Sequence, residues 1–384
     1  MLTSLAAVEP PLIAEVTSEQ SPDGTSVLVV RCVLPLGVKP GPNKYGMGVF
    51  ATRSFAKGEV LYTGTYAVIA DDGLASRTIR LETNEGTYPM VQSVHSVGVG
   101  NNERHLFTFD GFMNHSCEPN TYSADMNDSP GLGGSYKTVA LREINSGDEV
   151  TCDYDTFELD AADKGIDKCE CGASVCRGSA RGFKFVPEDK TLAMLPKVYD
   201  EVINEWLKIN PRIMYRHLVT PVGVAVRSKN EGKDLWLVAA QDFEPGDVLF
   251  EYRSEYFKSS DYDRLLANVD VVAEDEPLAP SRAAPGFWTE RTRLVVELPF
   301  LTHTVNRGSG SREFYHFDSF CNHSCCPNAA FDIRETNLCR TTAVKHIKKG
   351  EAITNDYASF DEELDGTVFE CMCGETNCRK IIKG

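Results

Sequence analysis

Short apolar runs separated by turn residues recur along most of the chain, and this pattern predicts a fold made mainly of β-strands. The first run, residues 27–30, follows a segment with several proline, serine and threonine residues, and we expect residues 1–25 to form a loose arm. Residues 50–69 alternate apolar and polar positions around Gly58, which predicts a strand, a turn and a second strand. A similar turn recurs around Gly246, again between apolar runs.

One helix is predicted near the middle of the chain. Its apolar residues recur at helical spacing and are Val198, Tyr199, Val202, Ile203, Trp206 and Leu207. Pro196 stands where the first turn of a helix tolerates proline, and Pro211 ends the pattern. We also expect a short helical insert at residues 264–266 and an acidic, proline-containing loop at residues 273–286.

Three motifs occur twice, in the same order and with similar gaps, so the chain contains an internal repeat. They are Asn-His-Ser-Cys at residues 114–117 and 322–325, Asp-Tyr at 153–154 and 356–357, and Cys-x-Cys-x4-Cys at 169–176 and 371–378. A chain of 384 residues has enough material for two domains. We therefore expect an arm (1–25), a first unit (26–185), a helical linker (186–213) and a second unit (214–384), with the units packed as an intramolecular pseudo-dimer.

Eight of the thirteen cysteines pair between the two copies, which points to metal rather than to disulfides. The pairs are Cys117 with Cys325, Cys169 with Cys371, Cys171 with Cys373, and Cys176 with Cys378. Four thiolates close a tetrahedral zinc site and leave no open position, so we predict two structural zinc ions. The alternative, buried or redox cysteines, does not explain why the spacing recurs. Reduced, metal-bound thiols favour the nucleus or the cytoplasm.

The net charge of −17 restricts the partners. Nucleic acid requires a basic face, so we expect no direct nucleic-acid binding. A cationic substrate, either a lysine-containing protein or a polyamine, suits an acidic protein, although the acidity could also serve solubility alone. The sequence has no run of about 18 apolar residues, so we expect no membrane partner.

The repeated motifs, together with Gly-Asp-Glu-Val ahead of the first Asp-Tyr, resemble those of the SET-domain lysine methyltransferases and their post-SET zinc module. The likeness covers roughly residues 26–182 and, more weakly, 214–384. It implies two mainly β folds with short helices (α+β), each with a pseudoknot and each closed by a zinc module of four cysteines. It also implies S-adenosylmethionine as the methyl donor and a lysine side chain as the acceptor.

The resemblance assigns roles to individual residues. The implied cofactor-binding residues are Gly46, Met47, Gly48, Asn114 and His115 in the first copy, and Asn322 and His323 in the second. Glycines allow the backbone to approach a cofactor closely. Tyr154 and Tyr357 are the implied catalytic tyrosines, and Tyr62 and Cys152 are candidates for the substrate channel. Methyl transfer mainly needs alignment and desolvation, so no nucleophile of the protein itself is required.

The second copy departs from the pattern, because Trp236 stands where the first copy has Gly48. We therefore predict that the first unit is the catalyst and that the second is a scaffold or a diverged active site. Cys152 replaces the Phe or Tyr that many family members carry, and the extra room predicts multiple methylation. Two alternatives remain, a methyltransferase for a free polyamine or other small amine, and a non-catalytic, zinc-stapled scaffold or binding module.

Overall fold

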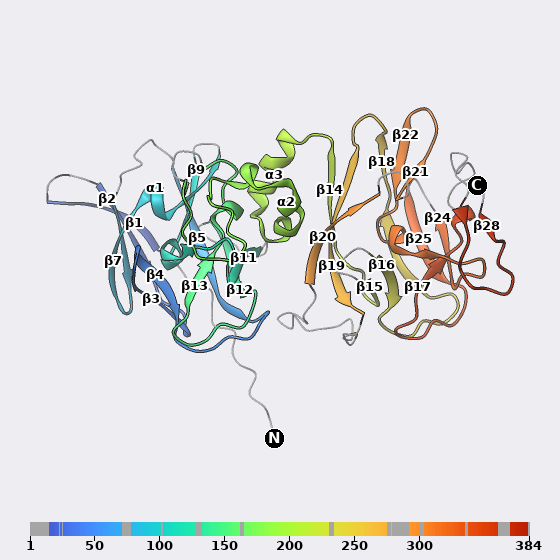
Figure 1. Ribbon diagram of the computed structural model, residues 1–384, viewed down its shortest axis with the longest axis horizontal. Coiled ribbons are helices and arrows are strands. Elements are labelled where there is room, and N and C mark those ends of the chain that lie inside the picture. The colour runs from blue at the N-terminus through green and yellow to red at the C-terminus, as the bar shows by residue number, and fades with distance from the viewer. Residues whose placement is uncertain are drawn as a thin grey trace, which may run out of the picture. The chain divides into compact units, whose positions relative to one another are not determined.

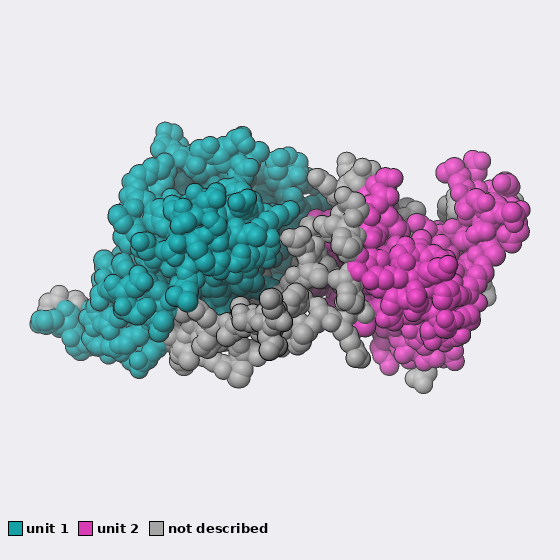
Figure 2. Space-filling model, turned by 90° about the horizontal axis from the view of Figure 1, so that it is seen from below, with its two compact units in different colours: residues 1–208 teal, residues 209–384 magenta. Residues whose placement is uncertain are grey.

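The chain forms two compact units, residues 1–208 (unit 1) and 209–384 (unit 2), which Figures 1 and 2 display. The computed structural model describes residues 15–22, 24, 26–70, 78–100, 103–126, 133–161, 165–229, 234–274, 278, 292–299, 303–334, 337–359 and 369–382. Both units consist mainly of short strands with a few helical turns, so the predicted fold class is confirmed. Among these residues, no helix is long and apolar enough to cross a membrane.

Unit 1 contains thirteen described strands in three sheets. They are β1 (Glu15–Gln20), β2 (Ser26–Cys32), β3 (Val38–Asn43), β4 (Gly46–Ala51), β5 (Val60–Ala70), β6 (Thr78–Thr83), β7 (Gly86–Val91), β8 (Val97–Gly100), β9 (Glu103–Phe107), β10 (Asn114–His115), β11 (Thr121–Met126), β12 (Gly133–Ala140) and β13 (Glu149–Cys152). The sheets run β1-β2-β6-β7, β10-β13-β4-β3 and β11-β12-β5-β9-β8. The parallel pairing of β10 with β13 brings the Asn-His motif beside the strand that precedes Asp-Tyr.

The prediction of a loose arm at residues 1–25 is wrong for residues 15–20, which form β1. Strand β1 pairs with β2 along its whole length, from Glu15 opposite Arg31 to Gln20 opposite Ser26. Arg31 also lies within ion-pair distance of Glu15 and Glu19. This segment has few apolar residues, so its sequence gives only a weak strand signal. It forms a strand because β2 supplies its backbone partners.

Unit 1 also holds the helices. These are α1 (Gln92–His95), α2 (Glu188–Met194) and α3 (Asp200–Ile209), with 3₁₀ turns η1 (Phe109–Phe112), η2 (Tyr154–Thr156), η3 (Phe183–Phe185) and η4 (Leu195–Lys197). The predicted central helix exists as α3, but it begins at Asp200, because Pro196 lies in the separate turn η4. Trp206 packs edge-on against Phe183, with ring centroids 5.8 Å apart, so α3 packs on unit 1.

Unit 2 repeats this construction with other strands. They are β14 (Ile213–Leu218), β15 (Val224–Lys229), β16 (Asp234–Ala239), β17 (Val248–Arg253), β18 (Glu255–Lys258), β19 (Arg264–Ala273), β20 (Thr292–Leu298), β21 (Thr304–Asn306), β22 (Ser311–Phe314), β23 (Asn322–His323), β24 (Ala329–Ile333), β25 (Leu338–Ala343), β26 (Thr354–Asn355), β27 (Phe369–Glu370) and β28 (Ile381–Ile382), with 3₁₀ turns η5 (His316–Phe320) and η6 (Tyr357–Ser359). The sheets run β14-β19-β15-β16 with β20 beside β19, then β17-β25-β24, β18-β22-β21, β23-β26 and β27-β28.

The predicted helical insert at residues 264–266 is wrong, because these residues begin β19. This strand pairs with β14, β15 and β20, and its residues Leu265, Leu266 and Ala267 are fully buried. A strand buried on both faces has a continuous apolar run rather than an alternating one, so its periodicity cannot be told from that of a helix. The predicted loop at residues 273–286 lies almost entirely outside the described residues.

Strand register aligns the two units residue by residue. Val38 pairs with Ala51 in unit 1, and Val224 pairs with Ala239 in unit 2. Three residues before each alanine stand Gly48 and Trp236, so the structure places this tryptophan at the position of the glycine.

Candidate functional site

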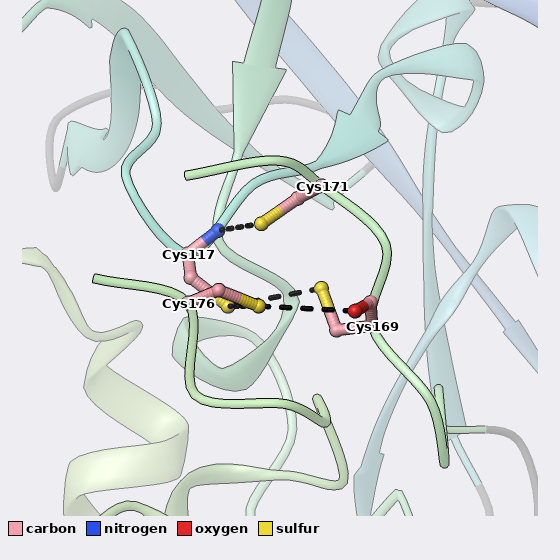
Figure 3. A group of neighbouring side chains, drawn as sticks. All are labelled: Cys117, Cys169, Cys171 and Cys176. Carbon is pink, nitrogen blue, oxygen red and sulfur yellow. Dashed lines mark hydrogen bonds between the residues drawn. The ribbon is translucent and has the colours of Figure 1, made fainter. Parts of the chain in front are cut away.

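The cysteine cluster of unit 1 joins the end of the β10 segment to the tail that follows η2 (Figure 3). The ligand atoms of Cys117, Cys169, Cys171 and Cys176 all lie within 4.8 Å of one another. The Sγ atom of Cys117 is 3.8 Å from that of Cys169 and 3.9 Å from that of Cys176. Although burial opposes it, backbone N–H groups of Cys117 and Ala173 lower the pKa of Cys171 to about 6. Four converging thiols, one of them readily ionised, match the ligand set of a tetrahedral zinc site.

The corresponding cluster of unit 2 differs from its predicted set in one ligand. Its compact group consists of His323, Cys325, Cys371 and Cys373, whose ligand atoms lie within 4.8 Å of one another. The fourth predicted thiol, Cys378, lies beside this group, with Sγ 3.6 Å from the carbonyl oxygen of Cys371. Three thiols and one imidazole also form a tetrahedral zinc site, so unit 2 offers five candidates for four positions.

A buried histidine connects each cysteine cluster to the tyrosine of the Asp-Tyr motif. In unit 1, His115 Nε2 lies 3.2 Å from Cys117 Sγ, and its Nδ1 accepts a hydrogen bond from the backbone N–H of Tyr154 at 3.2 Å. Burial lowers the pKa of His115, which favours the neutral ring that donates from Nε2 to a thiolate. In unit 2, His323 makes the same pair of contacts. The His115 side chain is thus directed at the cysteines, so only its backbone is free for the implied cofactor role.

An arginine connects the cysteine-bearing tail of unit 1 to the turn η2. Arg177 Nη2 lies 2.6 Å from a carboxylate oxygen of Asp153 and 2.6 Å from one of Asp155, and all three side chains are at most one-tenth exposed. Its backbone N–H also donates to Cys117 Sγ at 3.4 Å. In unit 2, Arg379 pairs with Asp356, and both side chains are more exposed. Sequence reasoning missed this pair of arginines, although each follows the last cysteine of its motif.

The residues implied to bind the cofactor converge in unit 1. Asn114 Nδ2 donates to the carbonyl oxygen of Met47 at 2.9 Å and to Glu149 Oε1 at 2.7 Å. These two bonds occupy the amide nitrogen of Asn114 and leave its amide oxygen as an acceptor for a ligand. A Cβ added at Gly48 would lie 2.6 Å from Glu149 Oε1, so a larger residue there would require the Glu149 side chain to move. Gly46 has φ +120° and open space beyond it, a conformation that favours glycine. Sequence reasoning missed Glu149, whose carboxylate orients Asn114.

The same position in unit 2 is built differently. Trp236 packs against an apolar cluster that includes Val238 and Val272. It also lines, with Asn322 and His303, a pocket of about 380 Å³. Unit 2 lacks both the glycine and the nearby glutamate of unit 1. Trp236 stands in place of Gly48, and Ala352, which follows Glu351, stands where Glu149 follows Asp148. The arrangement of Gly48, Asn114 and Glu149 in unit 1 is therefore not reproduced in unit 2.

The two predicted catalytic tyrosines occupy equivalent places. The hydroxyl of Tyr154 donates to the carbonyl oxygen of Met113 at 3.0 Å, and that of Tyr357 donates to the carbonyl oxygen of Cys321 at 2.9 Å. Burial raises the pKa of Tyr357 to about 12 and that of Tyr154 further still, so both hydroxyls stay protonated. Each tyrosine can therefore act as a fixed hydrogen-bonding group but not as a base at neutral pH.

The two predicted channel residues, Tyr62 and Cys152, both lie near the carboxyl group of Asp110, which sequence reasoning missed. Cys152 is buried and lines a pocket of about 200 Å³, whose wall also includes Arg177 and Met194. Burial, and then the charge of Asp110, raise the pKa of Tyr62 well above its ordinary value. The signal for this carboxyl was available, because Phe-Asp recurs ahead of Asn-His in both copies.

Comparison with known proteins places the same segments in one family. The model of the SET domain matches residues 46–155 and 235–358, more than half of the chain. The chain is 29% identical over 157 residues to the histone-lysine N-methyltransferase trr of Drosophila melanogaster, covering 40% of this chain and 5% of that protein. It is 30% identical over 146 residues to histone-lysine N-methyltransferase 2B of Homo sapiens, covering 35% and 5%.

A further relative comes from a fungus. It is the H3 lysine-36 specific histone-lysine N-methyltransferase of Eremothecium gossypii, 26% identical over 159 residues, covering 41% of this chain and 20% of that protein. The chain thus spans between a twentieth and a fifth of the length of these curated relatives.

Proposed function

Because the chain belongs to the SET-domain family, we propose that it is an S-adenosylmethionine-dependent N-methyltransferase that acts on lysine side chains of a protein, with catalysis in unit 1. The observation that carries this proposal is the convergence in unit 1 of Gly48, Asn114, Tyr154 and Cys152. These residues come from β4, β10, β13 and the turn η2, which the sheet order β10-β13-β4 brings together.

The residues of unit 1 fit S-adenosylmethionine, which would supply a methyl group activated by a sulfonium. Gly46 leaves open space where a side chain would stand, and Gly48 lets Asn114 and Glu149 approach the backbone. The amide oxygen of Asn114 suits the ammonium of an amino-acid moiety, since an ammonium has only donors. Tyr154, tied to Met113, holds its ring at the end of the strand that bears Cys152. Such fixed groups orient a reaction that depends on alignment.

Zinc is proposed as a structural ion in both units. In unit 1 the ion would join Cys117 to the tail and so fix the tail against η2. His115 would donate to the Cys117 thiolate while its other nitrogen holds the backbone of Tyr154. Hydrogen bonds of this kind set ligand orientation at metal sites. The metal would therefore position the catalytic tyrosine without touching the substrate.

The substrate is proposed to be a protein lysine, with histones as the first candidates, since the names of the three relatives specify histones for those proteins. The acidic chain, with a net charge of −17, suits a lysine-rich tail. Action on histones would place the protein in the nucleus, although a cytoplasmic substrate is compatible with the same chemistry. A free polyamine is the competing acceptor, and a non-catalytic scaffold is the competing role.

Unit 2 is proposed to serve as a scaffold rather than as a second catalyst. Trp236 replaces the close-approach glycine, and Ala352 stands where Glu149 orients the asparagine of unit 1. We propose domain bounds of 26–185 and 214–384, with residues 186–213 as the linker and the two units as a pseudo-dimer.

The test is methyl transfer from radiolabelled S-adenosylmethionine to core histones and, separately, to spermidine. We expect label on histone lysines, a loss of at least about 100-fold in Tyr154→Phe and no change in Tyr357→Phe. Label on spermidine alone would favour the polyamine alternative. No label on either acceptor, with no binding of S-adenosylmethionine, would favour the scaffold.

A further inference from the structure

One cysteine that does not belong to the repeated motifs is accessible to solvent. Eight of the thirteen cysteines recur in the two copies and five do not. Four of these five are buried, namely Cys32, Cys152, Cys321 and Cys339, whereas Cys326 is partly exposed. A dissolved oxidant has to reach the sulfur, so exposure decides which thiol it meets first. Among these five cysteines, Cys326 is the candidate for chemistry with a reagent from solution.

Lys345 brings its side-chain nitrogen directly onto Cys326. Its Nζ atom lies 2.8 Å from Cys326 Sγ and 2.8 Å from the carbonyl oxygen of the same residue. The contact with oxygen has the length of an ordinary hydrogen bond. The contact with sulfur is equally short, although sulfur is a larger atom than oxygen.

Other N–H groups that point at sulfur in this protein keep a longer distance. Backbone nitrogens donate to the sulfurs of the two cysteine clusters at 3.3 to 3.5 Å. The Lys345 nitrogen is therefore closer to Cys326 than a hydrogen bond to sulfur requires. A nitrogen and a sulfur that are bonded directly lie much closer than 2.8 Å, whereas two single bonds through one oxygen atom span about this separation.

Unit 1 has the same backbone arrangement with different side chains. In both units, the residue before the basic one donates its backbone N–H, at 2.8 Å, to an asparagine three residues beyond the cysteine of the Asn-His motif. Arg142 and Glu118 thus occupy the positions of Lys345 and Cys326. Arg142 Nη1 donates to the carbonyl oxygen of Glu118 at 3.4 Å. The basic residue binds the same carbonyl group in both units, but only unit 2 pairs an amine with a thiol at this place.

We propose that Cys326 and Lys345 form a covalent bridge in which one oxygen atom joins Sγ to Nζ, made by a peroxide and reversed by thiol reductants. This modification site lies in unit 2 and is independent of methyl transfer. Lys345 is exposed and Cys326 is partly exposed, so a peroxide can reach both. The backbone N–H of Cys326 donates to Ser324 Oγ at 3.0 Å, which holds the cysteine in position.

The bridge requires two molecules of hydrogen peroxide. In the first step the O–O bond of one peroxide breaks, Sγ becomes a sulfenic acid and loses two electrons, and water leaves. In the second step an N–O bond forms between the neutral lysine amine and the sulfenic acid. The amine and the sulfenic acid each lose one hydrogen, and the nitrogen loses two electrons. The second peroxide takes up these hydrogens and electrons and leaves as two molecules of water.

The bridge would close the base of the hairpin formed by β24 and β25, because Cys326 precedes β24 and Lys345 follows β25. A cross-link of this kind restricts the unfolded chain and so favours the folded state. It would also fix the segment that carries Cys325, a candidate zinc ligand. The modification therefore acts on the part of unit 2 that bears its cysteine cluster.

The experiment treats the full chain with hydrogen peroxide, blocks the remaining free thiols, and analyses the digested protein by mass spectrometry. We expect a cross-linked pair of peptides, one with Cys326 and one with Lys345. Its mass should equal the sum of the two peptides plus one oxygen and minus two hydrogens. A parallel sample that is treated with a thiol reductant after oxidation should yield both peptides unmodified.

Two variants provide matched controls. Lys345→Arg keeps the positive charge and the contact with the carbonyl group, as Arg142 does in unit 1, so it should fold normally and form no bridge. Its Cys326 should take up oxygen alone, as sulfenic or sulfinic acid. Cys326→Ser should form no bridge either. The double variant Glu118→Cys with Arg142→Lys recreates the pair in unit 1 and should form a second bridge there.

The readout is a mass, so the result does not depend on whether the chain transfers methyl groups. A cross-link that has lost two hydrogens without gaining oxygen would show a direct N–S bond and would overturn the oxygen bridge. Equal oxidation of Cys326 in wild type and in Lys345→Arg, with no cross-linked peptide in either, would overturn the proposal as a whole.

Discussion

The two units share the residues that hold the fold together and differ where the chemistry of a methyltransferase would take place. Each has a carboxyl group directly after a phenylalanine, Asp110 in unit 1 and Asp318 in unit 2. Asp318 accepts hydrogen bonds from Tyr252, Thr341 and Asn355, whereas Asp110 faces the hydroxyls of Tyr62 and Tyr136. Unit 1 has Cys152 where unit 2 has Asn355, so it lacks the amide donor that Asp318 receives. Completing its own hydrogen bonds stabilises a protein and at the same time removes a place for a ligand.

The two units also differ at the position expected to contact the cofactor. In unit 1 the backbone at Gly48 is approached by polar groups of Asn114 and Glu149, whereas in unit 2 Trp236 packs into an apolar cluster. A tryptophan there contributes apolar burial, and the glycine contributes only space. Unit 2 has thus gained packing where unit 1 retains open polar geometry.

The largest expected effect concerns the two cysteine clusters. We expect two zinc ions per chain, and Cys176→Ser should remove one of them, since Cys176 belongs to the compact group of unit 1. Loss of that ion would remove roughly 10 kcal/mol of binding free energy, by comparison with structural zinc in small domains. Cys378→Ser should remove the other, because Nδ1 of His323 accepts the Tyr357 N–H, so Nε2 carries the ring proton and cannot replace the thiol as a ligand. Zinc content by mass spectrometry measures this.

The matched controls replace the histidine next to each cluster by alanine. His323→Ala and His115→Ala should each keep both ions, because each ring accepts a backbone N–H at Nδ1 and so carries its proton on Nε2. Cys326→Ser, next to a proposed ligand but outside both groups, should keep two ions. Retention of zinc in Cys378→Ser with loss in His323→Ala would instead show that His323 and three thiols hold the ion of unit 2.

The arginines that follow the clusters should differ next most strongly. Removing Arg177 leaves the buried carboxylates of Asp153 and Asp155 uncompensated, so Arg177→Ala should cost about 3–5 kcal/mol of unfolding free energy. Arg379 is 41% exposed, and Arg379→Ala should cost less than about 1 kcal/mol. Chemical denaturation of the two variants provides the comparison. Equal losses would show that the Arg177 pairs have no special role.

Cofactor binding should distinguish the units as well. Asn114→Ala should weaken S-adenosylmethionine binding by about 100-fold, roughly 2–3 kcal/mol, since a buried partner of a charged group is lost. Asn322→Ala should bind like wild type. Calorimetry with wild type and both variants measures the affinities and the number of sites. Two sites, each lost with its own variant, would mean that Trp236 does not block the cofactor and that unit 2 is also a methyltransferase centre.

The smallest effect concerns the number of methyl groups added. The small Cys152 side chain leaves room beside the amine, so wild type should form multiply methylated lysine and Cys152→Phe should shift the product toward monomethyl-lysine. Overpacking of a buried position should cost a further 1–3 kcal/mol, approximately, in stability. Mass spectrometry of the products decides, with Cys152→Ala as the control that keeps the room. An unchanged distribution in Cys152→Phe would contradict the idea.

Secondary structure was predictable where its signal is local. The turn at Gly58 and the helix α3 follow from residue pattern, because turn chemistry and helical spacing depend on near neighbours. The strands β1 and β19 were not predictable in this way. Strand β1 depends on ion pairs and on β2, and β19 has a continuous apolar run because it is covered on both faces.

The sequence by itself determined the repeat, the family likeness and most of the candidate metal ligands, because these depend on residue type and spacing. Only the tertiary structure brought Glu149 to Asn114, placed His323 among the thiols of unit 2, and gathered Tyr62, Tyr136 and Cys152 around Asp110. Those contacts join residues far apart in the chain. Whether a buried carboxylate is satisfied or left open depends on hydrogen-bond geometry across strands, which no one-dimensional pattern contains.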